Sequence, residues 1–116
     1  MGEGRHKRGL AAARRIETTA QVVREARSHA KEAEPSELRD VARRQLKKLR
    51  DVLNELQRVV LRDGLSKDAS AHLTRQLETL EHSLASQALA PVDDATLERL
   101  VGCAKAARLD LKARLR

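Results

Sequence analysis

The chain has 116 residues, of which 35% are charged and 41% hydrophobic, with a net charge of +7 and no Phe, Tyr or Trp. This length fits one domain, and the balance of charge and hydrophobicity is that of a globular protein rather than a disordered one. Because no aromatic ring is present for bases to stack on, single-stranded nucleic-acid recognition in its usual form is excluded. Any core must be built from 18 Leu, 8 Val, one Ile and alanines.

The single cysteine, Cys103, allows no internal disulfide and favours a reducing compartment. No apolar run is long enough to cross a bilayer, and the first residues lack the apolar segment of a signal peptide. The sequence therefore predicts a soluble, cytoplasmic protein.

Residues 1–9 are predicted to be a basic, flexible tail, and a first helix is predicted over about 10–33. The apolar seam of this helix consists mostly of small residues and includes one arginine: Ala13, Ile16, Ala20, Val23, Arg27 and Ala30. Such a seam either packs closely against its neighbours or belongs to a helix that can move aside.

The second helix, over 36–63, has the clearest periodicity. Apolar residues recur at alternate steps of four and three, which is typical of the core-facing stripe of a helix bundle: Ala42, Leu46, Leu49, Leu53, Leu56 and Val60. Pro35 suits the start of a helix, and Gly64 suits the left-handed residue that ends one.

The third helix is predicted over about 66–89, with Ser66 as its N-cap, and the fourth over about 93–115, with Asp93 as its N-cap. The predicted apolar seams are Leu73, Leu77, Leu80 and Leu84 in the third helix and Leu97, Leu100, Ala104, Ala107, Leu111 and Leu115 in the fourth. Cys103 lies beside the apolar seam of the fourth helix and is predicted to be a small core residue. Short connections between the helices predict an all-α, antiparallel up-down-up-down four-helix bundle over 10–116.

This topology predicts that positive charge gathers at one end of the bundle. Segments 1–15, 58–68 and 108–116 contain twelve Lys and Arg against four Asp and Glu, a net charge of +8. Segments 31–40 and 90–99, at the other end, contain three basic and seven acidic residues, a net charge of −4. Helix dipoles account for part of this polarity, but not for cations at the start of the first helix.

The turn "VVLRDGLSKD" at 59–68 has two interpretations. Leu61 and Leu65 either close the end of the core or form a small apolar wedge within a basic ring. The residues predicted to bind an anionic surface are Arg5, Lys7, Arg8, Arg14, Arg15, Arg62, Leu65, Lys67, Lys112, Arg114 and Arg116.

The segment "RRQLKKLR" contains a second basic cluster: Arg43, Arg44, Lys47, Lys48 and Arg50. This cluster is an alternative binding face, for duplex nucleic acid contacted through its phosphates alone. Arg24 and Arg27 of the first helix are placed to extend it. Asp40 and Asp51 are placed to pair with Arg44 and Lys47, which weakens the cluster.

Neither the four histidines nor Cys103 forms a pattern typical of metal binding or nucleophilic catalysis. The sequence therefore predicts no cofactor, no metal and no enzymatic activity. The predicted helices are also too long for a helix-turn-helix DNA-binding motif.

A four-helix bundle with a basic, leucine-bearing end resembles the membrane-localisation bundles of bacterial toxins and injected effectors. The resemblance covers residues 10–115 at the level of architecture, and it implies docking of one end on anionic lipid head groups. The first functional hypothesis is accordingly a targeting module that is peripheral on the inner face of a membrane. The alternatives are a protein-interaction or regulatory bundle, with a second copy or an acidic protein as partner, and sequence-neutral binding of duplex nucleic acid.

Overall fold

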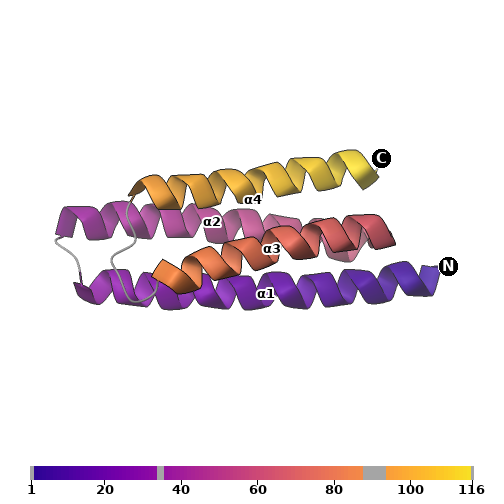
Figure 1. Ribbon diagram of the computed structural model, residues 1–116, viewed down its shortest axis with the longest axis horizontal. Helices are drawn as coiled ribbons and strands as arrows, with labels where there is room; N and C mark the ends of the chain where they lie inside the picture. The colour runs from indigo at the N-terminus through magenta and orange to yellow at the C-terminus, as the bar shows by residue number, and fades with distance from the viewer. Residues whose placement is uncertain (1, 34–35, 88–93, 116) are drawn as a thin grey trace.

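A computed structural model of the chain contains four helices: α1 (Gly2–Ala33), α2 (Ser36–Asp63), α3 (Lys67–Gln87) and α4 (Asp94–Leu115). The structure describes the backbone of residues 2–33, 36–87 and 94–115, and the side chains of 7–28, 37, 39–85 and 95–114. The helices form an elongated bundle measuring 52 × 20 × 18 Å (Figure 1). The predicted four-helix bundle is confirmed.

Successive helices run in opposite directions, but their order around the bundle is α1, α2, α4, α3 (Figure 1). The antiparallel neighbours are α1 with α2 and α3 with α4, whereas α1 with α3 and α2 with α4 are parallel neighbours. Among the described residues α2 does not pack against α3, although residues 64–66 alone connect them. The expectation that helices adjacent in sequence are also adjacent in space therefore fails for this pair.

The turn between α2 and α3 connects two helices that are diagonally opposite in the bundle. Gly64 has φ of 68°, and its N–H donates to the carbonyl of Val60 at 2.9 Å, which ends α2 as the sequence predicts. Ser66 caps α3, because its Oγ accepts from the N–H of Ala69 at 3.3 Å. Leu65, between them, is fully buried. The connection thus crosses the end of the bundle with the side chain of Leu65 packed into the core.

The helix α1 begins eight residues earlier than predicted, so residues 2–9 are its first turns rather than a flexible tail. Gly9 is buried, and a Cβ atom there would lie 3.3 Å from the carbonyl oxygen of Val60 and 3.5 Å from the Cα of Gly64. This close approach anchors the start of α1 against the end of α2.

The core follows the predicted seams, with one correction in α1. Arg27 is exposed, and Ala26 takes the buried position instead. The predicted seam residues of α2, α3 and α4 are buried wherever their side chains are described: Ala42, Leu46, Leu49, Leu53, Leu56, Val60, Leu73, Leu77, Leu80, Leu84, Leu97, Leu100, Ala104, Ala107 and Leu111. The caps predicted at Pro35 and Asp93 lie outside the described residues.

Each pair of neighbouring helices is also joined by a polar contact. Between α1 and α3, Thr19 is fully buried and its hydroxyl lies 2.9 Å from a carboxylate oxygen of Glu81. The other contacts are Gln57 Nε2 to the carbonyl of Ala13 at 3.3 Å (α2 to α1), Arg108 to Glu55 at 2.7 Å (α4 to α2) and His72 to Asp110 at 2.8 Å (α3 to α4). Such contacts require particular partners and so favour one register of the helices over others.

Candidate functional site

The three basic segments lie together at one end of the bundle, as predicted. Both chain termini and the α2–α3 turn lie at the same end in Figure 1. The contact of Gly9 with Val60 and Gly64 links the first segment directly to the turn. We refer to segments 2–15, 58–68 and 108–115 as the cationic end.

The two leucines of the turn take different roles. Leu65 is fully buried and closes the core, so its predicted contact with an anionic surface is wrong. Leu61, in the last turn of α2, is 49% exposed. The core-closing interpretation therefore holds for Leu65, whereas the wedge interpretation stays a prediction, for the exposed Leu61 alone.

Several predicted cations are paired with carboxylates within the chain. Arg15 lies 2.5 Å from Glu81, Arg62 lies 3.0 Å from Asp63, and Arg114 lies 3.0 Å from Asp110. Arg108 and Lys112 share Glu55, at 2.7 and 3.6 Å. Glu55 and Glu81 lie outside the segments counted in the sequence, so the charge of the cationic end is smaller than the sequence predicts.

These ion pairs also shift the pKa values of two of their members, Glu55 and Arg62. The hydrogen bond from Arg108 lowers the pKa of Glu55, and the charges of Arg108 and Lys112 act in the same direction. The adjacent Asp63 raises the pKa of the Arg62 guanidinium. At neutral pH Glu55 therefore remains charged and paired with Arg108 and Lys112.

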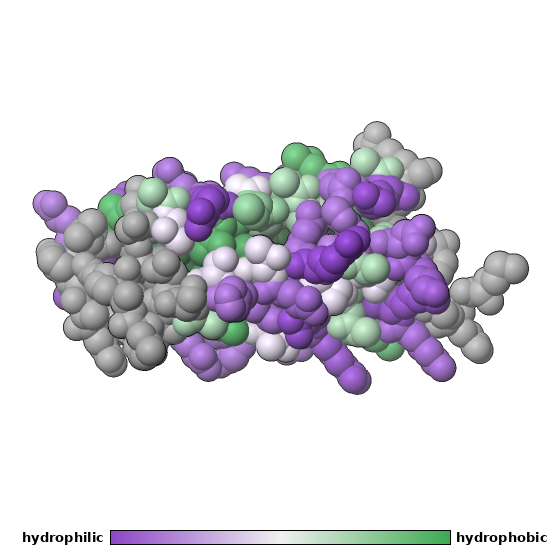
Figure 2. Space-filling model, viewed as in Figure 1, coloured by the Kyte–Doolittle hydropathy of each residue, from purple (hydrophilic) through white to green (hydrophobic). Residues whose placement is uncertain are grey.

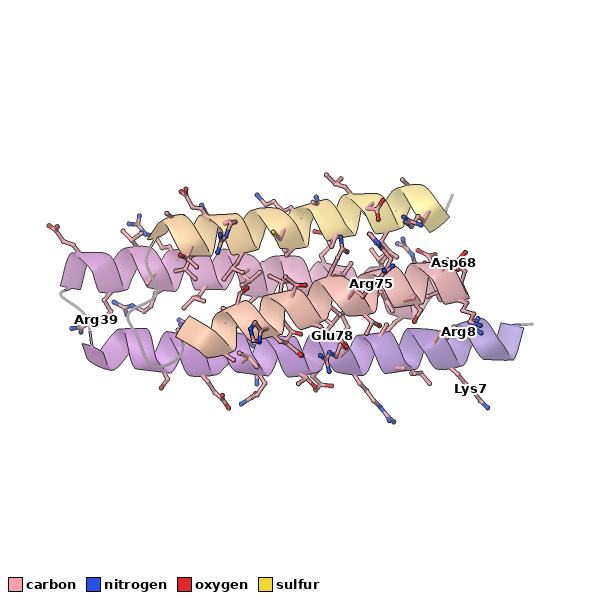
Figure 3. The ribbon with its side chains drawn as sticks, in the orientation of Figure 1. Lys7, Arg8, Arg39, Asp68, Arg75 and Glu78 are labelled. Carbon is pink, nitrogen blue, oxygen red and sulfur yellow. The ribbon has the colours of Figure 1, made fainter. Side chains whose placement is uncertain are left out.

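Five cations of the cationic end have no ion-pair partner among the described residues: Lys7, Arg8, Arg14, Arg58 and Lys67. Figure 3 shows Lys7 pointing away from the bundle, whereas Arg8 lies on the side of α1 that faces α3. The side chain of Arg5 and the whole of Arg116 lie outside the described residues. The five unpaired cations are the groups available to an external anion.

Exposed apolar side chains accompany these cations. Among the described residues the large hydrophobic side chains with high exposure are Leu10, Leu61 and Leu109, at 42%, 49% and 58%. Leu10 and Leu61 each follow a residue of the Gly9–Val60 contact, so both lie at the same level of the α1–α2 seam. The cationic end is therefore apolar as well as basic.

A second basic site lies further along the seam between α1 and α2. Arg27 of α1 and Arg43, Arg44 and Lys47 of α2 surround an open hollow of about 530 Å³, together with Asp40. We refer to these residues as the basic hollow. Arg27 thus extends the cluster as predicted, whereas Lys48 lines a different hollow, next to α4. Arg50 is half-buried and lines neither hollow.

The predicted ion pairs of this cluster are wrong. Asp40 pairs with Arg43 rather than with Arg44, and Asp51 has no ion-pair partner among the described residues. The Nε atom of Arg43 is buried without a hydrogen-bond partner within the described part of the chain. Among the described residues, the basic hollow is therefore lined by four cations and one carboxylate.

Cys103 is exposed, which corrects its predicted place in the core. The buried residues around it are Leu100, Val101 and Ala104, so Cys103 lies one helical step off the core-facing stripe. Among the described side chains no group of three or more His, Cys, Asp or Glu residues could hold a metal ion. None of the helices, over the residues described, is both long and apolar enough to cross a membrane.

The fold and the site together define an all-α four-helix bundle with a cationic, leucine-bearing end. No known protein family, characterised protein or solved structure matches the chain.

Proposed function

We propose that the chain is a non-enzymatic targeting module whose cationic end docks on an anionic membrane surface. The observation that carries this proposal is that, among the described residues, five cations without an ion-pair partner lie at the same end of the bundle as Leu10 and Leu61. Each cation near an anionic bilayer contributes about 1 kcal/mol, so five suffice for reversible binding. The two leucines would add shallow apolar contact, as in other peripheral membrane proteins.

The test is co-sedimentation with lipid vesicles that contain or lack phosphatidylserine. We expect binding that requires phosphatidylserine and weakens at high salt, because the attraction is electrostatic. Reversing Lys7, Arg14 and Lys67 to Glu together should weaken binding by at least about a hundredfold. Arg75→Glu, in the middle of α3, makes the same charge change as Lys67→Glu alone but away from the end, and it should have a smaller effect than that single reversal. Equal sedimentation with neutral and anionic vesicles contradicts the proposal.

The basic hollow favours a second function, the sequence-neutral binding of duplex nucleic acid through phosphates. Four cations from two helices converge there. Affinity for an arbitrary duplex should then fall steeply with salt. Reversal of Arg44 and Lys47 should abolish that affinity, whereas reversal of Lys7 and Lys67 should reduce it less.

A further inference from the structure

The helix α4 is buried on one face, and its opposite, exposed face carries mostly small or apolar residues together with Arg99. Its inner face carries the buried Leu97, Leu100, Ala104 and Leu111. We define the outer face of α4 by its small or apolar exposed residues: Ala95, Gly102, Cys103, Ala106, Leu109 and Ala113. Figure 2 shows hydrophobic colour on α4 and on the surface between α4 and α3. A helix face of mostly small or apolar residues is normally covered by a neighbour.

Grooves flank the outer face of α4 on both sides. On the α3 side, Cys103 and Ala106 line a groove of about 500 Å³ that also includes Leu80 and Leu100. On the α2 side, Gly102 and Lys105 line a hollow of about 230 Å³. The ridge of small residues along α4 therefore stands between two depressions, a shape that accepts the side chains of another helix.

Gly102 has no role within its own chain that requires glycine. It is exposed in the middle of α4, and a Cβ atom there would meet nothing within 4 Å among the described residues. Glycine at such a position destabilises a helix by about 1 kcal/mol relative to alanine. The missing side chain does allow a close approach, and the place for one is the outer face of α4.

The charges along one edge of this face indicate what approaches it. Glu98 and Lys105 lie seven residues apart, on opposite sides of Gly102 along the helix. Both are exposed, and neither has an ion-pair partner among the described residues. A second α4 running antiparallel places its Lys105 opposite Glu98 and its Glu98 opposite Lys105, whereas a parallel one opposes like charges.

We infer that a second copy of this chain packs antiparallel against the outer face of α4, with the two helices crossing at Gly102. The edge is complementary to itself under a two-fold axis, which is the property an isologous dimer interface requires. The inference does not depend on the proposed membrane role, because Leu109 and Ala113 are the parts of the cationic end that it uses, and neither they nor any other residue of the interface is among the five unpaired cations.

The first test is sedimentation equilibrium of the full chain and of charge variants. We expect a monomer–dimer equilibrium for the wild type. Glu98→Lys or Lys105→Glu should raise the dissociation constant at least about tenfold, because two symmetry-related pairs become repulsive at once. The double exchange of both residues should restore the wild-type value. Glu17→Lys makes the same charge change as Glu98→Lys on α1 and is the matched control.

The second test uses Cys103, which lies next to the crossing point and is exposed. A short bis-maleimide reagent should link two wild-type chains efficiently, and Glu98→Lys should reduce the yield. A chain that remains monomeric up to near-millimolar concentration overturns the inference. A dimer that is unaffected by both single charge reversals, or that is not linked through Cys103, overturns it equally.

Discussion

The two leucines that flank Gly64 allow a direct test of how the α2–α3 turn is built. Leu65 is fully buried, whereas Leu61 is 49% exposed. Truncating a buried leucine to alanine costs about 2–5 kcal/mol, and a site at the end of a core can relax, so we expect about 2–3 kcal/mol for Leu65→Ala. Leu61→Ala changes the same number of atoms on the surface and should cost no more than about 0.5 kcal/mol.

Urea unfolding followed by circular dichroism measures both variants, at the same protein concentration as the wild type. With a denaturant slope of about 1.5–2 kcal/mol/M, Leu65→Ala should lower the unfolding midpoint by roughly 1–2 M. The midpoint of Leu61→Ala should stay close to that of the wild type. Two results would refute the conclusion that Leu65 closes the end of the core. One is a similar loss of unfolding free energy in the two variants, and the other is a loss below about 1 kcal/mol for Leu65→Ala.

Three further changes test single features of the bundle. Gly102→Ala should stabilise the dilute monomer by about 1 kcal/mol in urea unfolding, because the new methyl group enters open space in a helix. The lowered pKa of Glu55 stabilises the fold above the ordinary value of 4.5, and this contribution is lost as pH falls through the lowered value. Acid titration of Glu55→Gln should therefore show a shallower loss of stability in that range than the wild type. Glu81→Ala removes the carboxylate that pairs with α1 and should cost about 1 kcal/mol in the same unfolding assay, whereas Glu78→Ala, 3.9 Å from the same arginine and 57% exposed, should cost little.

Helix positions were predictable where the signal is local. The bounds of α2 agree with the prediction at both ends, because a regular apolar stripe stops at a glycine that adopts a left-handed conformation. The capping role of Ser66 was predictable for the same reason, since its hydrogen bond reaches only three residues along the chain. The buried stripes of α3 and α4 followed from their periodicity.

The differences from prediction come from contacts between distant residues. The early start of α1 depends on Gly9 meeting Val60, which no local pattern indicates. The cationic end is partly neutralised by Glu55 and Glu81, and Arg108 lies 53 residues from its partner in sequence. The prediction for Cys103 failed for a different reason, the limited precision of a helical pattern. One residue along a helix turns the side chain by about 100°, which is enough to move it from the core to the surface.

The proposed dimer constrains how the cationic ends could meet a membrane. Antiparallel packing through α4 directs the cationic ends of the two copies in opposite directions along bundles 52 Å long. A flat membrane then contacts both ends only if the dimer lies on its long side. The α1–α2 seam is the candidate for that contact, since it carries Leu10, Leu61 and the basic hollow.

Lying on the long side would bring the basic hollow to the lipid surface, and this has a measurable consequence. Reversal of Arg44 and Lys47 to Glu should weaken binding of the wild-type dimer to phosphatidylserine vesicles about as much as reversal of Lys7 and Arg14. In the background of Glu98→Lys, where the monomer is free to dock on its end, the same reversal in the hollow should matter much less. If the hollow variants bind vesicles as tightly as the wild type in both backgrounds, the bundle docks through its cationic end alone, and one end of each dimer faces away from the membrane.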